Sequence, residues 1–347
     1  MTWEVHDLRG YRRSANRKML VPLTLPYALI AEFHCRVQLA GIRRDPLLPL
    51  ISLGNLEAGG TGKTPAVLAL AKLLQESGIR PAVLTGLPGR RGKAVFHSRE
   101  PGFRNQAADE ALLLSRSLPE CPLVAARPKW KGVELLDKPE ESDLILLDDG
   151  FQHRRLARDL NLLLLSGRTP LSFSQVLPAG DLREAPGFAL RRADAFVVPE
   201  DVPLPENLPE RPVFRTGVLS AGLLALDGSS RKPSDSGLIA LSGIARPESF
   251  EENLAGLGTL KASLRFPDHA PMTPRFREQC LNLLSRFSGS QLVITAKDAC
   301  RWTDDPLFDV QEPWILDHQI EWREPGVFLS WIRDALGFPV ESGGKLD

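Results

Sequence analysis

A glycine-rich turn stands between an apolar run and an amphipathic stretch in residues 51–74, ISLGNLEAGGTGKTPAVLALAKLL. The run LPLISLG predicts a strand over 48–54. The following segment predicts a helix over 64–78, with an apolar stripe made of Val67, Leu70, Leu73 and Leu74. A turn between a strand and a helix can surround phosphate oxygens with backbone N–H groups. We therefore predict a nucleotide phosphate-binding loop.

The loop departs from the strict pattern GxxxxGK[ST], because Glu57 occupies the position of the first glycine. The remaining glycines keep the turn permissive, so we interpret it as a variant P-loop. Lys63 is expected to reach the β- and γ-phosphates, and Thr64 to offer its hydroxyl to Mg²⁺. The predicted nucleotide-binding residues are Gly59, Gly60, Thr61, Gly62, Lys63 and Thr64.

A pair of aspartates follows the apolar run in DLILLDDG, residues 143–150. A P-loop site needs a carboxylate at the end of a neighbouring strand to organise Mg²⁺, so Asp148 and Asp149 are candidate metal ligands. Either aspartate could instead cap a helix. Gln152 and His153 come next and are expected at the same strand end.

Short apolar runs alternate with helical patterns after residue 45, which indicates strands buried on both faces of a mostly parallel α/β sheet. At 347 residues the chain is long enough for two domains. Prolines 199, 203, 205, 209 and 212 mark a connection. We expect an N-terminal segment, a P-loop domain, a connecting segment and a smaller α/β domain at residues 1–44, 45–200, 201–236 and 237–347.

Charge and cysteine usage exclude several classes of protein. The formal net charge is zero, so no overall field favours nucleic acid. The four cysteines share no metal-like spacing and indicate reduced thiols in a cytosolic protein. No apolar stretch is long enough to span a bilayer.

The N-terminal region is basic, and residues 19–44 show an apolar helical pattern. Such a helix can lie in a membrane interface, or it can pack on its own domain. The pattern alone leaves both interpretations open.

Four motifs give the chain a specific resemblance. GNLEAGGTGKTP, DDGFQHRRLARD, LPAGDLRE (177–184) and FPDH (266–269) are similar, in this order, to the tetraacyldisaccharide 4′-kinase family, the lipid A 4′-kinases of Gram-negative-type bacteria. The resemblance covers residues 20 to 330. It implies a P-loop α/β domain with a smaller α/β domain, and transfer of the γ-phosphate of ATP to the 4′-hydroxyl of a tetraacyl disaccharide 1-phosphate. It further implies Mg²⁺, a peripheral location at the cytoplasmic face of the inner membrane through the N-terminal helix, and no obligate protein partner.

The resemblance also assigns roles that the residues alone do not. It implies that Asp109, in AADEALLL, accepts the proton of the sugar hydroxyl with support from His269 in FPDH. Glu184 is expected to order the metal or nucleotide site. Arg127 is a candidate for binding a phosphate, since a guanidinium group matches phosphate geometry. Gln152 and His153 complete the expected substrate contacts.

One segment and two single residues depart from the family pattern. The glycine-rich segment is TGLPGRRGK at residues 85–93, without the family's aromatic residue, and Ala108 and Ala270 replace a glycine and a histidine. Two other functions are considered. A membrane-associated P-loop nucleotide hydrolase acting as a switch would not need the later motifs, and a kinase with a soluble acceptor leaves the basic N-terminus unexplained.

Overall fold

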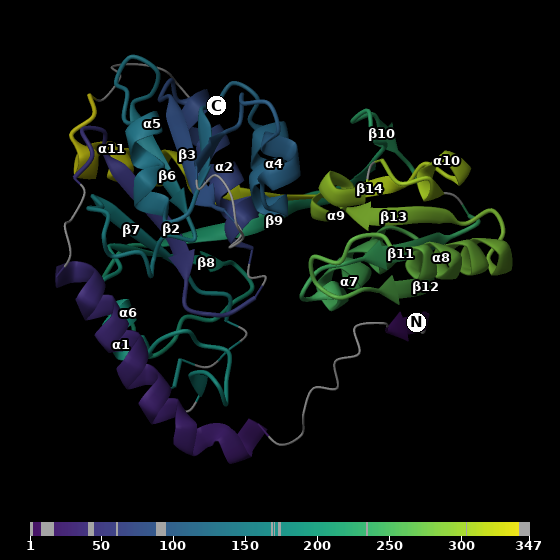
Figure 1. The fold of residues 1–347 in the computed structure, drawn as a ribbon, viewed down its shortest axis with the longest axis horizontal. Helices are drawn as coiled ribbons and strands as arrows, with labels where there is room; N and C mark the ends of the chain where they lie inside the picture. Colours follow the sequence, from purple (N-terminus) through teal and green to yellow (C-terminus); the bar gives the residue numbers. More distant parts are fainter. Residues whose placement is uncertain are drawn as a thin grey trace. The chain divides into compact units, whose positions relative to one another are not determined.

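The structure is a computed structural model that describes residues 3–7, 17–40, 45–59, 62–87, 95–167, 169, 171–172, 175–233, 235–302 and 304–339. Contacts divide the chain into two compact units (Figure 1). The larger unit comprises Ser14–Gly217 and Ile320–Asp347, and the smaller comprises Met1–Arg13 and Val218–Gln319.

The larger unit is built on a mostly parallel sheet, which confirms the predicted fold class. Its strands run in the order β9-β8-β7-β2-β6-β3-β5-β4, and β4 is antiparallel to β5. The strands are β2 (Leu50–Asn55), β3 (Pro81–Gly86), β4 (Val95–His97), β5 (Leu123–Ala126), β6 (Leu144–Asp148), β7 (Leu160–Leu164), β8 (Ala195–Pro199) and the first part of β9 (Val213–Leu224).

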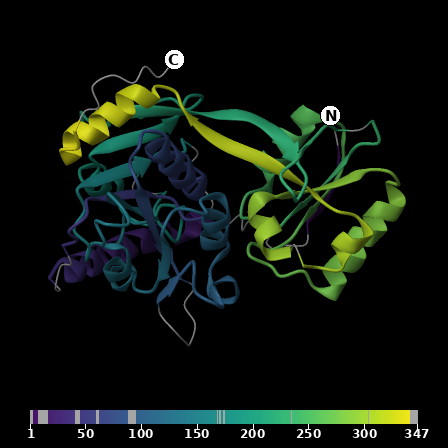
Figure 2. The same cartoon turned by 90° about the horizontal axis from the view of Figure 1, so that it is seen from above.

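Helices flank this sheet. The C-terminal helix, drawn in yellow in Figure 2, returns to the larger unit, where Arg333 donates a hydrogen bond to the Ser77 carbonyl at 2.8 Å. The α-helices are α1 (Thr24–Ala40), α2 (Lys63–Glu76), α3 (Phe103–Gln106), α4 (Asp109–Ser117), α5 (Val133–Leu136), α6 (Pro186–Leu190) and α11 (Pro325–Leu336); the 3₁₀ helices are η1 (Arg17–Leu23) and η2 (Lys129–Lys131).

The two central strands explain where the site forms. Every residue of β2 and β6 is buried, as expected for strands covered on both faces. The strands are parallel, and Leu53 pairs with Asp148. The P-loop after β2 and the aspartates at the end of β6 therefore lie at the same edge of the sheet.

Helix α1 begins at Thr24, so part of the predicted 19–44 helix is the 3₁₀ helix η1, and residues 41–44 lie outside the described residues. Ala28 packs into a core cluster with Ala189 and Leu190 of α6, beside which α1 lies in Figure 1. Large apolar side chains also remain exposed on α1, so its apolar residues are not confined to one side. They are Leu25, Leu29, Ile30, Phe33 and Val37.

The smaller unit is a parallel sheet in the order β1-β12-β11-β13-β14 with helices packed on it. Its core contains Phe266 and Trp302, whose rings meet edge to face. Its elements are β1 (Glu4–Asp7), β10 (Ser230–Arg231), β11 (Leu238–Ser242), α7 (Pro247–Leu257), β12 (Leu260–Arg265), α8 (Pro274–Arg286), β13 (Gln291–Thr295), α9 (Ala296–Trp302), α10 (Leu307–Val310) and the first part of β14 (Trp314–Trp322).

The contacts group the chain differently from the domain boundaries expected from sequence. Residues 320–347 belong to the larger unit, because α11 packs there. The N-terminal strand β1 pairs with β12 of the smaller unit. The segment 201–236, expected to be a connecting segment, contains β9, which starts directly after the last proline of the run.

Candidate active site

The P-loop turns sharply at its glycines. Gly59 and Gly62 have φ angles of 93° and 80°, a region that side-chain-bearing residues rarely adopt. Gly62 immediately precedes α2, so the free N–H groups at the start of that helix face the turn. Gly60 and Thr61 lie outside the described residues. This is the strand–turn–helix context that the sequence predicted.

Lys63, the first residue of α2, extends toward the aspartates. Its Nζ donates a hydrogen bond to Asn55 Oδ1 at 3.0 Å and lies 3.6 Å from Asp149 Oδ1. Burial lowers the pKa of Lys63, and the neighbouring Asp149 acts in the opposite direction. Thr64 follows on α2 and is half-buried.

Asp148 is buried at the end of β6. One carboxylate oxygen accepts a hydrogen bond from Thr85 at 2.8 Å, and the buried Oδ1 has no hydrogen-bond partner among the residues that the structure describes. Burial raises the pKa of this carboxyl group. An unpartnered buried carboxylate oxygen is costly unless a further group binds it.

Asp149 adopts a left-handed backbone conformation with φ of 48°. Arg183 contacts both of its carboxylate oxygens at 3.0 Å. Burial acts to raise the pKa of Asp149, but Lys63, Arg183 and Lys129 outweigh it and lower the pKa to about 2. Asp149 is therefore ionised among three cations.

Arg183 and Lys129 were not singled out in the sequence, although Arg183 lies within LPAGDLRE. This segment is held against the P-loop: the Arg183 N–H donates to the Leu56 carbonyl at 2.7 Å, and the Ala58 N–H donates to the Asp181 carbonyl at 2.7 Å. Lys129 belongs to no recognised motif, so nothing in the sequence singled it out.

Glu184 is buried beside this segment. It accepts hydrogen bonds from Arg192 at 2.8 and 3.0 Å and from Gln152 at 3.1 Å. Gln152 also donates to the Asn55 carbonyl at 3.0 Å. The structure thus brings Gln152 and Glu184 together and ties both to the end of β2.

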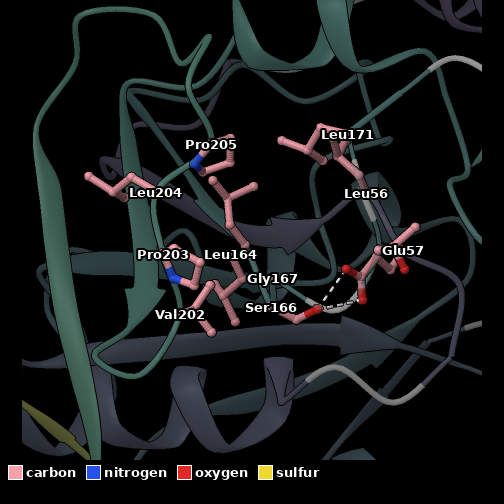
Figure 3. Close-up of a pocket in the computed structure, with 12 residues that line it drawn as sticks. Leu56, Glu57, Leu164, Ser166, Gly167, Leu171, Val202, Pro203, Leu204 and Pro205 are labelled. Atoms are coloured by element: carbon pink, nitrogen blue, oxygen red, sulfur yellow. Dashed lines mark hydrogen bonds between the residues drawn. The ribbon is translucent and has the colours of Figure 1, made fainter.

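Glu57, which occupies the position of the first glycine of the strict pattern, points its side chain toward Ser166. Its buried carboxylate accepts a hydrogen bond from the Ser166 hydroxyl, which lies 2.6 and 2.7 Å from the two oxygens (Figure 3). Glu57 and Ser166 line a pocket of about 220 Å³ whose other walls are mostly apolar. These walls include Leu56, Leu164, Leu171, Val202, Pro203 and Leu204.

His153 and Arg127 occupy different surroundings. Burial lowers the pKa of His153 to about 4, with Lys129 as the next contribution, so this imidazole is neutral at pH 7. Arg127 is exposed directly after β5.

The two proton-transfer candidates belong to different units. Asp109 is buried and opens α4, with Ala108 preceding the helix in an extended conformation. His269 is an exposed residue of the smaller unit with φ of 60°, and its Nε2 lies 3.5 Å from Lys297 Nζ and 3.6 Å from Asp268 Oδ2. Ala270 is buried, and its carbonyl accepts a hydrogen bond from Trp302.

The residues at the end of β6 fit Mg²⁺. Among the described residues, no cluster of three or more His, Cys, Asp or Glu side chains has a metal-binding arrangement. Mg²⁺ is commonly held by one or two carboxylates together with water and substrate phosphates. Asp148, whose Oδ1 has no partner among the described residues, and the ionised Asp149 supply two such carboxylates.

This loop, its helix and the neighbouring aspartates define a P-loop nucleotide-binding protein of the α/β class. Residues 16–337 match the family described as Tetraacyldisaccharide-1-P 4'-kinase. The chain belongs to the tetraacyldisaccharide-1-P 4′-kinase family.

Similar proteins cover nearly the whole chain. The Tetraacyldisaccharide 4'-kinase of Geobacter metallireducens is 36% identical over 82% of this chain and 88% of that protein. The protein of the same name from Aeromonas hydrophila is 33% identical over 96% of both chains. Among solved structures, "apo" form LpxK from Aquifex aeolicus in complex with ATP has a TM-score of 0.71 and 29% identity, covering 92% of this chain and 99% of that one.

Proposed function

We infer that this protein is an ATP-dependent lipid kinase that phosphorylates the 4′-hydroxyl of tetraacyldisaccharide 1-phosphate. The observation that carries this inference is the cluster of Lys63, Asp148, Asp149 and Arg183 beside the P-loop, in a chain that matches the kinase family over residues 16–337. The alternative of a nucleotide-hydrolysing switch is not favoured, because the similar proteins carry the kinase name.

We propose the following roles in phosphoryl transfer. Lys63 binds the transferred phosphoryl group and stabilises its negative charge. Thr64, Asp148 and Asp149 would hold Mg²⁺, which neutralises phosphate charge when bound. The 4′-oxygen attacks the γ-phosphorus, the bond to the leaving ADP oxygen breaks, and Asp109 accepts the hydroxyl proton. His269 is proposed to support that proton transfer.

The remaining predicted residues have proposed positioning or substrate roles. Gln152 and Glu184 are proposed to hold the start of the P-loop in place, since both lie near the end of β2. Arg127 is proposed to contact a phosphate group, and its exposure leaves the guanidinium accessible. His153 is proposed as a neutral substrate contact.

We further propose that α1 associates with the membrane surface at the cytoplasmic face of the inner membrane. Ile30 and Phe33 are each 68% exposed. Large exposed apolar side chains that lie close together on one helix often mark a site of membrane contact. Burial raises the pKa of Tyr27, which lies on the same helix. The charges of Arg183 and Glu184 also act on this pKa, so Tyr27 lies near these two residues. In the part of the chain that the structure describes, no helix has both the length and the apolar character needed to cross a membrane.

Phosphate transfer from γ-labelled ATP tests the kinase activity. The acceptor is tetraacyldisaccharide 1-phosphate in mixed micelles with Mg²⁺, and a soluble amino sugar is the control acceptor. We expect label in the lipid alone. Label released only as free phosphate would contradict the kinase and favour the hydrolase.

Sedimentation with anionic phospholipid vesicles tests the role of α1. The double variant Ile30→Asp, Phe33→Asp should lose vesicle binding. Val327→Asp is the control, because Val327 is 59% exposed on α11. Equal binding by both variants would refute a membrane contact through α1.

A further inference from the structure

Lys129 is a buried lysine that the proposed reaction does not use. It opens the short 3₁₀ helix η2 after β5, and only 6% of its surface is exposed. Its side chain runs beside β3, since a Cβ placed on Gly86 would lie 3.5 Å from the Lys129 Cε. Lysine is rarely buried to this degree without a specific partner.

The partners of Lys129 are two successive backbone carbonyls. Its Nζ donates hydrogen bonds to the carbonyl oxygen of Asp148 and, at 2.8 Å, to that of Asp149. These oxygens belong to the two peptide planes that flank the Asp149 Cα. The orientations of these planes define the φ and ψ angles of Asp149, so one ammonium group constrains both angles.

The constrained conformation is one that a side-chain-bearing residue adopts at a cost. Asp149 has φ of 48°, in the left-handed region. In this conformation its carboxylate lies 3.6 Å from Lys63 and 3.0 Å from Arg183. Lys63 and Arg183 contact the side chain, whereas Lys129 bonds to the main chain on both sides of it.

We propose that Lys129 is a positioning residue that holds the backbone of Asp149 in its left-handed conformation and so aims the carboxylate at the metal and phosphate site. The proposal rests on the proposed function in that Asp149 is taken as a metal ligand. Groups that orient a metal ligand typically change metal affinity by about 10- to 100-fold when they are removed.

Direct metal binding tests this proposal in Lys129→Met, which removes the donors but keeps an unbranched apolar side chain. The probe is Mn²⁺ with a non-hydrolysable ATP analogue, followed by electron paramagnetic resonance. We expect roughly 10- to 100-fold weaker Mn²⁺ binding per folded molecule. The matched control is Lys131→Met, an exposed lysine two residues along the same 3₁₀ helix, which should bind Mn²⁺ like the wild type.

Unchanged Mn²⁺ affinity in folded Lys129→Met would overturn the proposal, and so would an absence of Mn²⁺ binding in the wild type. If Lys129→Met does not fold, Lys129→Arg is measured in the same way. Arginine keeps the charge but carries its donors on a longer planar group, so Mn²⁺ binding should still weaken; wild-type affinity would overturn the proposal. A wild type that binds Mn²⁺ but transfers no label to lipid would refute the proposed function instead.

Discussion

Replacing Gly54 by alanine should displace the aspartate turn without removing any functional group. Gly54 lies on β2 directly against Phe151, and an added Cβ would be 2.6 Å from the Phe151 Cβ and 3.0 Å from its backbone nitrogen. Ordinary contacts begin at 3.4 Å, so the two segments must separate by about 0.8 Å. Phe151 is fully buried and two residues from Asp149, so this movement reaches the proposed metal ligands.

Two magnitudes follow from this displacement. Overpacking of this kind costs about 1–3 kcal/mol in the free energy of unfolding. A shift near 1 Å at a catalytic site lowers the rate by about 10²-fold. We therefore expect Gly54→Ala to remain folded but to lose kcat by roughly two orders of magnitude.

The assay is transfer of γ-label to the lipid, with urea unfolding of the same preparation. Gly187→Ala on α6 is the matched control, because a Cβ there meets no atom within 4 Å. The control should keep wild-type kcat and stability. Wild-type turnover in Gly54→Ala would refute the view that the close contact between Gly54 and Phe151 sets the position of the aspartates.

Three further predictions concern single side chains. Lys63→Ala should lower kcat by about 10²–10³-fold, measured by label transfer, because it removes charge stabilisation at the phosphoryl group; normal activity would mean that the loop does not bind phosphate as proposed. Asp109→Ala should lower transfer by about 10²–10⁴-fold while ATP affinity, measured by calorimetry, stays unchanged; wild-type turnover would exclude Asp109 as the base. Asp305→Asn should destabilise the smaller unit by about 1–3 kcal/mol at pH 7, because Arg277 hydrogen-bonds both carboxylate oxygens and lowers the Asp305 pKa. Because the pKa of Asp305 is lowered in the folded state, its ionised carboxylate stabilises the fold above the usual carboxyl pKa, and this stabilisation is lost as the pH falls and the group is protonated. The difference in the free energy of urea unfolding between wild type and Asp305→Asn should therefore shrink as the pH falls below about 4. A difference that does not depend on pH would contradict this.

The fold was predicted best where strands are buried on both faces. The apolar run at 48–54 predicted β2 to within two residues of its observed bounds, and the run before the aspartate pair corresponds to β6. Strands without such runs were missed. In β12 apolar residues alternate with polar ones, and β9 follows a proline-rich stretch that predicted only a connection.

The parts of the candidate site that could be expected from sequence are those whose motif lies at a strand end or a strand–turn–helix junction. Gly62, Lys63 and the aspartate pair follow from the order of strand, turn and helix, so their meeting at one sheet edge could be expected. Lys129 reaches the backbone carbonyl of Asp149, and Arg183 reaches its carboxylate, from segments 20 and 34 residues away along the chain. Their positions depend on how β5 and LPAGDLRE pack against the central strands, and no sequence period encodes that packing.

The return of α11 to the larger unit has a consequence for synthesis on the ribosome. Phe214 of β9 packs against Phe328 and Trp331 of α11, with ring centroids 4.4 and 5.2 Å apart. All of residues 218–319 are translated between these partners. The 218–319 part of the smaller unit is thus inserted between the first part of β9 and α11 in the chain. The nascent P-loop unit carries an uncovered aromatic surface until α11 leaves the exit tunnel, and at that stage it can bind chaperones or aggregate.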